Sequence, residues 1–242
     1  MWISAFLIDL KGKNVMTGYR IHFIRHAITL ANEEGRYIGI TESPISERGR
    51  RELAEKTEKF VYPEVDKVYV SPLKRCIATA SFIYPQGYAP VVPEFREMNF
   101  GEFEGKKAAD LMGRPDYKQF LRGGLDNPAP GGEPMRKVVE RCYEGVQFVI
   151  EDMMRNGYKN AAVVTHGGII MNILSCFGLP KFSPNDFACD FGEGFSVLVT
   201  AQMWQQSNAF EILGRLPYLK NESGEASEFD SFADDEADYH EE

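Results

Sequence analysis

Short apolar segments that each end in an ionisable residue recur along this chain of 242 residues. In chain order, Arg25 and His26 follow 21–24, Arg75 follows 67–71, Glu97 follows 89–92, and His166 follows 161–164. If these segments are parallel strands of an open sheet, their carboxyl ends face one crevice, which is where such sheets bind ligands. The sequence therefore predicts that two arginines, two histidines and one glutamate meet at one edge of a sheet.

Helical patterns separate the predicted strands. The predicted helices span 47–60, 72–84, 134–155 and 167–177, and two further strands span 195–202 and 208–214. Pro72 is expected at the first helical position, which proline favours. Alternating strands and helices with continuous apolar runs are typical of an α/β fold. We therefore predict a doubly wound three-layer sandwich with a mostly parallel central sheet.

The ends of the chain differ from this central part. Residues 1–20 are predicted to be an N-terminal extension, either upstream of a true start at Met16 or forming an extra strand at 3–10. Residues 21–217 are predicted to form the domain, with 98–133 as a partly helical lid. Residues 218–242 are predicted to be an acidic, disordered tail, because they offer little apolar surface for a core.

The net charge of −9 comes almost entirely from that tail. Residues 221–242 hold ten of the 36 acidic residues and no Lys or Arg, so the rest has 27 basic against 26 acidic residues, a net of +1. A nearly neutral body without a basic run argues against a nucleic-acid partner. Without a secretory leader or an apolar run of about 18 residues, the chain is expected to be cytoplasmic and without a membrane partner. Its four cysteines lie far apart and are expected to be reduced core thiols.

The converging residues have a shared chemical logic. Two guanidinium groups, on Arg25 and Arg75, offer forked donors that match phosphoryl oxygens. Nearby positive charge should keep His26 neutral, so that its ring nitrogen can attack phosphorus. Glu97, if protonated, can donate to the leaving oxygen, and His166 can donate to the phosphoryl group. The simpler alternative is an arginine that forms an ion pair at a strand end beside a packed histidine.

Four motifs in this order resemble the histidine phosphatase superfamily, in the branch that contains cofactor-dependent phosphoglycerate mutases and related phosphatases. The Arg-His-Gly-x-Thr signature is matched at 25–29, with Asn32 at the usual place after it, and Ser-Pro-Leu-x-Arg-x-x-x-Thr-Ala is matched at 71–80. Glu-x-x-Phe-Gly-x-x-Glu-Gly is matched at 97–105, and Thr-His-Gly-Gly at 165–168. Each motif alone is weak, but four in order are specific.

The resemblance implies a role for each matched residue. His26 would become a phosphohistidine, and the phosphoryl group would be held by Arg25, Arg75 and His166. Glu97 would act as acid and base, Asn32 would line the pocket, and Thr29 would support the turn. The resemblance also implies neither a metal nor a cofactor, and a small phosphorylated metabolite as the partner. It leaves the natural substrate and the oligomeric state open.

Two departures from the family pattern stand out. Ala27 occupies the position of the usual glycine, which puts its local dihedral in question but leaves its backbone N–H available. Pro134 stands where relatives often have serine, and it is compatible with the first helical position.

The resemblance implies a compact phosphatase that hydrolyses phosphate monoesters. The rival within the superfamily is a phosphoglycerate mutase. Such mutases carry a longer insertion between the glutamate segment and the second histidine, and this interval is short here. The rival from another class is a catalytically inactive module that binds phosphorylated ligands on the same fold. All five central residues are present, which argues against the inactive module.

Other histidines and aromatic residues have simpler explanations. His22 lies on the same strand face as His26 but deeper, so we expect a packed core or edge histidine. Tyr37 and Tyr117 could stack on a substrate, but packing of a loop is the expected role. His240 is expected to be solvated.

Overall fold

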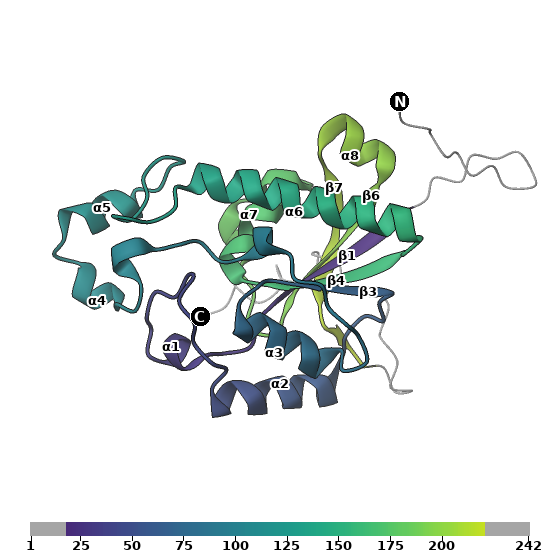
Figure 1. The fold of residues 1–242 in the computed structure, drawn as a ribbon, viewed down its shortest axis with the longest axis horizontal. Coiled ribbons are helices and arrows are strands. Elements are labelled where there is room, and N and C mark those ends of the chain that lie inside the picture. The colour runs from purple at the N-terminus through teal and green to yellow at the C-terminus, as the bar shows by residue number, and fades with distance from the viewer. Residues whose placement is uncertain (1–17, 221–242) are drawn as a thin grey trace, which may run out of the picture.

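A six-stranded sheet occupies the centre of the computed structural model, which describes residues 18–220 (Figure 1). Its strands, in spatial order, are β3 (Lys67–Val70), β4 (Asn160–Thr165), β1 (Gly18–Arg25), β6 (Gly194–Thr200), β7 (Phe210–Leu216) and β5 (Gly178–Leu179). Strands β3, β4 and β1 run parallel, β6 is antiparallel to β1 and β7, and β5 is parallel to β7. The three neighbouring parallel strands end at the same edge of the sheet, as the sequence predicted.

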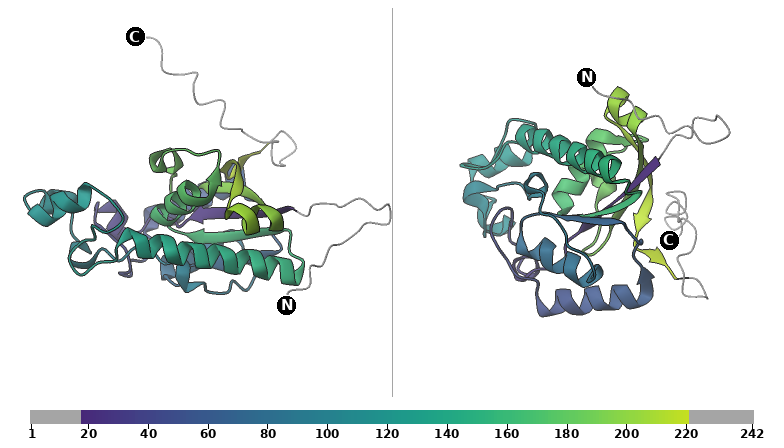
Figure 2. Two further views of the ribbon diagram at one scale, coloured as in Figure 1. Left: turned by 90° about the horizontal axis from the view of Figure 1, so that it is seen from above. Right: turned by 45° about the vertical axis from the view of Figure 1, so that its right-hand side comes forward.

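Helices cover both faces of this sheet and make three layers (Figures 1 and 2). One face carries α6 (Met135–Asn156), α7 (Gly167–Phe177) and α8 (Ala201–Ser207), and the other carries α2 (Glu47–Lys59) and α3 (Lys74–Ile83). Because side chains alternate along a strand, β1 contributes to both layers. Its Ile21 and Phe23 pack in the larger core with α6 and α7, whereas Ile24 packs with Cys76 and Ala80 of α3.

Helix α6 forms because one of its faces is apolar along its whole length. The buried apolar side chains of this face are Val138, Cys142, Val146, Val149, Ile150 and Met153. Burial of such a side chain stabilises the fold by about 1.5–3 kcal/mol relative to exposure. The N-cap Pro134 has no side-chain capping bond, so packing rather than capping stabilises the helix start. Gly157 ends the helix in the left-handed conformation, with φ 73°, that glycine adopts without strain.

The lid predicted at 98–133 packs as a small unit of its own beyond the sheet edge (Figure 1). It contains α4 (Ala108–Leu111), α5 (Pro115–Leu121) and the 3₁₀ turn Gly101–Phe103. Its core consists of Phe103, Leu111, Tyr117 and Ala129. The Tyr37 hydroxyl lies 2.9 Å from that of Tyr117, so both tyrosines pack the loop, as expected.

The remaining elements are short. They are α1 (Leu30–Glu33), the two-stranded sheet β2 (Phe60–Val61) and β8 (Tyr218–Leu219), and the 3₁₀ turns Pro93–Phe95 and Pro184–Phe187. His22 is buried and shares a hydrogen bond of 2.8 Å with Ser196 Oγ, in agreement with its predicted core role.

The structure corrects several predicted boundaries. Residues 89–92 do not form a strand, because only Val91 bridges to Val70. Pro72 precedes α3, which begins at Lys74 after the N-cap Leu73, and Pro134 is itself the N-cap of α6. Helix α8 was not predicted: it begins within the strand expected at 195–202 and fills the interval before the strand expected at 208–214.

The domain also extends slightly beyond its predicted limits. Strand β1 begins at Gly18, and Tyr218–Leu219 pairs with β2, so these residues belong to the folded domain rather than to the termini. The possible strand at 3–10, the start at Met16, the tail beyond 220 and His240 all lie outside the described residues. Among residues 18–220, no helix has both the length and the apolarity needed to cross a bilayer.

The four cysteines are free, as predicted, but they are not all core residues. Cys76, Cys142 and Cys189 are buried, whereas Cys176 is exposed on α7. Cys176 therefore corrects the expectation of four core thiols.

Candidate active site

The carboxyl ends of β1, β4 and β3 are joined by backbone hydrogen bonds that continue past the strands. His26 N donates to Thr165 O at 2.9 Å, and Ser71 N donates to Val164 O at 3.0 Å. These bonds place the residue after β1 beside the residue after β4. The rings of His26 and His166 consequently lie 5.2 Å apart, edge to face.

His26 is held in one tautomer by the backbone carbonyl of the next residue, Ala27. Its Nδ1 lies 2.7 Å from Ala27 O, and because a carbonyl only accepts, Nδ1 carries the hydrogen. The lone pair of the neutral ring is therefore on Nε2. The pKa of His26 is lowered to about 3, mainly by burial and then by the positive charges of Arg75 and Arg25. The hydrogen bond to Ala27 O acts in the opposite direction and raises this pKa. The ring is neutral at physiological pH, as predicted, although burial is a larger cause than the positive charges.

Two arginines flank His26, and each is held by backbone carbonyls. Arg25 Nη1 donates to Cys189 O at 2.6 Å, and its guanidinium carbon lies 3.7 Å from the centre of the Phe191 ring. Arg75 is almost fully buried and donates to Gly39 O at 2.6 Å and to Thr41 O at 3.0 Å. In both arginines, the Nε atom is buried and has no hydrogen-bond partner among residues 18–220.

His166 lies at the start of α7 and is fully buried. Its Nε2 lies 2.8 Å from Ser71 Oγ, the residue directly after β3. Burial is the largest cause, followed by the neighbouring His26 and then by arginines, and together they lower the pKa of His166 well below its ordinary value. As the N-cap of α7, His166 lies at the helix end whose backbone N–H groups favour anions.

Glu97 reaches the site from a 3₁₀ turn rather than from a strand. Thr165 Oγ1 donates to Phe95 O at 2.8 Å and thereby attaches this turn to the end of β4. A Cβ added to Gly168 would lie 3.0 Å from Glu97 Oε1, so the carboxyl lies against the start of α7. Burial raises the pKa of Glu97, although the Met98 N–H and three arginines act in the opposite direction.

Arg141 binds the backbone directly before Glu97, and this role was not predicted. From α6 it donates through Nη1 to the carbonyls of Glu94 and Arg96, both at 2.6 Å. Its other nitrogens bind Glu133, with Nε to Oε1 at 2.9 Å and Nη2 to Oε2 at 3.0 Å. The sequence feature that could have revealed this role is the place of Arg141 within the apolar face of α6, because an arginine buried there needs a partner for its charge.

Two expectations about the first turn need adjustment. The side-chain oxygen of Asn32 accepts from Thr29 N and Thr29 Oγ1, at 3.2 and 2.8 Å, so Asn32 caps α1 together with Thr29. This supports the predicted role of Thr29 in the turn, but it ties Asn32 to the turn rather than to the other site residues. The N–H of Ala27 is not available, because it donates to Thr79 Oγ1 at 2.9 Å. Ala27 does not have a positive φ, so alanine fits this position without strain.

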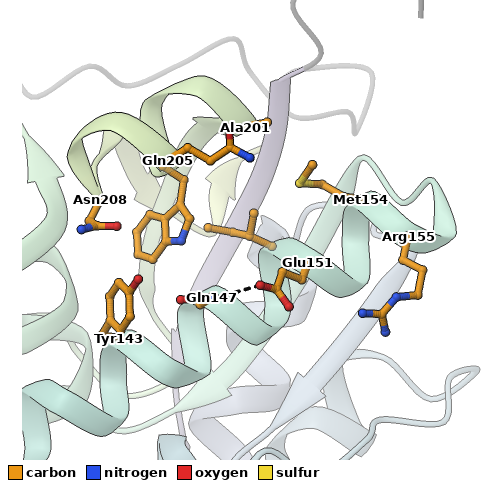
Figure 3. Close-up of a pocket in the computed structure, with 10 residues that line it drawn as sticks. Tyr143, Gln147, Glu151, Met154, Arg155, Ala201, Gln205 and Asn208 are labelled. Atoms are coloured by element: carbon orange, nitrogen blue, oxygen red, sulfur yellow. Dashed lines mark hydrogen bonds between the residues drawn. The ribbon is translucent and has the colours of Figure 1, made fainter. Parts of the chain in front are cut away.

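A separate cavity of about 580 Å³ lies between α6 and α8, with Tyr143, Gln147, Glu151 and Gln205 among its lining residues (Figure 3). Helix α8 follows Thr200, which pairs with Gly18 at the opposite end of β1 from His26. This cavity is therefore not part of the site described above. Within residues 18–220, no three His, Cys, Asp or Glu side chains are grouped so that they could hold a metal ion.

Comparison with known proteins agrees with this geometry. A sequence profile of the histidine phosphatase superfamily (branch 1) matches residues 21–205. Phosphoserine phosphatase 1 of Hydrogenobacter thermophilus is 27% identical over 71% of this chain and 82% of its own length. The metal-independent phosphoserine phosphatase of Arabidopsis thaliana is 30% identical over 71% of this chain and 75% of its own. The crystal structure of the alpha-ribazole phosphatase from Shigella flexneri superimposes with a TM-score of 0.63 and 26% identity, covering 74% of this chain and 89% of that one. The chain belongs to the histidine phosphatase superfamily.

Proposed function

We propose that this protein hydrolyses small-molecule phosphate monoesters through a phosphohistidine formed on Nε2 of His26. The observation that carries the proposal is the pair of buried guanidinium Nε atoms, on Arg25 and Arg75, that lack partners among the described residues. Buried donors are almost always satisfied, so two unsatisfied donors beside a neutral histidine indicate a place for an anion. A phosphoryl dianion offers the oxygens that both arginines need.

The reaction proceeds in two balanced steps. In the first, the Nε2 lone pair attacks phosphorus, an N–P bond forms, the ester P–O bond breaks, and Glu97 gives its proton to the departing oxygen. In the second, Glu97 takes a proton from water, whose oxygen attacks phosphorus as the N–P bond breaks. Arg25, Arg75 and His166 hold the phosphoryl oxygens in both steps. None of these steps uses a metal or a cofactor.

Support for the acid role of Glu97 comes from its raised pKa and from its place beside α7. Phosphate esters of small hydroxy compounds are the proposed substrates, because relatives are named phosphoserine phosphatase and alpha-ribazole phosphatase. We further propose a cytoplasmic location, which suits a protein with four free cysteines, and neither a nucleic-acid nor a membrane partner.

The test compares two leaving groups in two variants. His26→Ala should be inactive toward every ester, because no other residue accepts the phosphoryl group. Glu97→Gln should lose about 10²–10⁴-fold toward an alkyl ester such as O-phosphoserine, since an alkoxide leaves poorly without a proton. With an aryl phosphate, whose phenolate leaves unaided, the same variant should form the intermediate nearly as fast as wild type and then turn over slowly.

Burst kinetics distinguish these outcomes. Stopped-flow measurement of Glu97→Gln with an aryl phosphate should show about one equivalent of phenolate before slow turnover. Glu102→Gln is the matched control, because Glu102 pairs with Arg114 on the exposed surface of the neighbouring turn. Equal losses for both esters without a burst would remove Glu97 from the acid role. Activity that survives His26→Ala would refute the phosphohistidine itself.

A further inference from the structure

The carboxylate of Glu104 collects the backbone N–H groups of one loop. Oε2 accepts from Gly39 N at 3.0 Å and from Thr41 N at 3.3 Å, and Oε1 accepts from Ile40 N at 3.1 Å. Oε1 also accepts from Phe100 N at 3.0 Å, within the segment that carries Glu104 itself. One side chain thus satisfies three successive amides of residues 39–41 and attaches this loop to the lid.

The carbonyls of the same loop point to Arg75. Its Nη2 donates to Gly39 O and its Nη1 to Thr41 O, so both arms of the guanidinium fork are occupied by the loop. The arginine is 1% exposed, and its Nε remains without a partner among the described residues. Residues 39–41 therefore lie between a carboxylate that binds their N–H groups and a guanidinium that binds their carbonyls.

The close packing of the loop leaves little freedom for another arrangement. A Cβ on Gly39 would lie 1.8 Å from Met98 O and 2.4 Å from Glu104 Oε1, so only glycine fits between them. At the other end of the loop, the Glu42 carboxylate accepts from Lys74 N at 3.2 Å, at the start of the helix that carries Arg75. The loop is consequently fixed to the lid and to α3 at the same time.

We propose that Glu104 is a positioning residue for the phosphate site: through the backbone of residues 39–41, it fixes the orientation of the Arg75 guanidinium, so that Nε points to the phosphoryl group. This inference rests on the proposed role of Arg75 as a phosphate ligand. Glu104 does not contact the substrate. It acts by holding the carbonyls that accept from both Nη atoms.

Position 104 needs a carboxylate because this group can accept several hydrogen bonds at once. A carboxylate accepts at two oxygens without presenting any donor, whereas a glutamine amide accepts at one oxygen and turns an NH₂ group toward N–H donors. In Glu104→Gln, at least one amide of the loop loses its acceptor and faces another donor. The loop should then loosen, and the two carbonyls that hold Arg75 should move with it.

The experiment measures the affinity for inorganic phosphate, by isothermal titration calorimetry and by competitive inhibition of aryl phosphate hydrolysis. Glu104→Gln should weaken phosphate binding about 10- to 100-fold. This corresponds to a loss of roughly 1.4–2.8 kcal/mol, because each 1.4 kcal/mol is ten-fold in affinity, and it is the magnitude expected when charge-assisted hydrogen bonds are disturbed. Glu102→Gln, a nearby exposed carboxylate, should leave the affinity unchanged. Glu104→Asp keeps the charge but is one methylene shorter, so it should show a smaller loss and serves as the second variant if Glu104→Gln fails to fold.

A double-mutant cycle separates positioning from a general structural effect. In an Arg75→Lys background, where no fork binds the two carbonyls, Glu104→Gln should change phosphate affinity by less than about two-fold. An equal loss in both backgrounds would overturn the proposal, as would an unchanged affinity in Glu104→Gln. Binding is read without turnover, so a chain that binds phosphate but hydrolyses no ester would refute the proposed function and not this inference.

Discussion

Replacement of Arg141 by methionine tests how strongly the structure depends on the buried ion pair behind Glu97. Arg141 and Glu133 are 7% and 11% exposed in their side chains, and two hydrogen bonds join them. Removal of the arginine leaves Glu133 with Arg96 at 3.3 Å and Asn99 N at 3.4 Å. Breaking one side of a buried pair costs about 3–5 kcal/mol, because the remaining charge stays desolvated.

This cost translates into a measurable melting temperature. For a domain of this size, each kcal/mol shifts Tm by about 2–4 °C, so Arg141→Met should melt about 6–20 °C lower. Arg136→Met is the matched control on the same helix, because Arg136 pairs with Asp126 at 2.7 Å with side chains 52% and 66% exposed. An exposed pair contributes about 0–1 kcal/mol, so this control should shift Tm by at most about 4 °C.

Two further readouts link the ion pair to catalysis. Because Arg141 also holds the carbonyls of Glu94 and Arg96, its loss should lower kcat toward alkyl esters more than toward aryl esters, through misplacement of Glu97. Glu133→Gln in the Arg141→Met background should recover part of the lost Tm, because the carboxylate that lost its two bonds to Arg141 is then uncharged. Equal Tm shifts for Arg141→Met and Arg136→Met in thermal unfolding would refute the reasoning.

The other predictions concern metals and pH. Hydrolysis should persist after EDTA treatment. The converging groups are two arginines, two histidines and one carboxylate, whereas Mg²⁺ prefers several oxygen ligands. A loss of activity that a divalent ion restores would contradict this prediction. Burial lowers the pKa of His22 to about 4 and that of His26 to about 3, and lowers that of His166 as well. Below pH 6.5 the unfolded chain therefore binds protons that the folded chain does not, so stability should be complete above about pH 7. It should fall toward pH 4 by at most about 1.4 kcal/mol per pH unit for each histidine. Urea midpoints between pH 8 and 5 measure this slope, and His22→Gln should reduce it; midpoints independent of pH would contradict the prediction.

The convergence of the site could be predicted from the sequence because it follows from the topology of parallel strands. Arg25 is the last residue of β1, and His26 and His166 directly follow β1 and β4, which are neighbours in the sheet. Arg75 follows β3 and lies in the first turn of α3, at the same sheet edge. A residue directly after a parallel strand has little freedom in where it lies, so the order of the motifs was sufficient.

The position of Glu97 depends on contacts that local patterns do not contain. Residues 89–92 have the composition of a strand, but they make only one isolated bridge to the sheet edge, at Val70 and Val91, and the chain then turns through Pro93–Phe95. What places Glu97 is the bond from Thr165 to Phe95 O and the two bonds from Arg141. Each joins residues at least 45 positions apart in the chain, and such pairs leave no periodic signal. The role of Glu104 was missed for the same reason, although its motif was found.

In the proposed mechanism, the charges around the site also explain how Glu97 would act as an acid beside arginines. Arg75, Arg141 and Arg25 all favour the ionised carboxylate, and the Met98 N–H does so too, but burial outweighs them and raises the pKa of Glu97. A bound phosphoryl dianion neutralises the arginine charges and adds negative charge next to the carboxyl. Both effects favour the protonated form further, so the substrate itself promotes the state of Glu97 that its leaving group requires. In the proposed mechanism, the carboxylate that remains once the alcohol has left with the proton is the base that the attacking water needs, so the same residue would serve both steps.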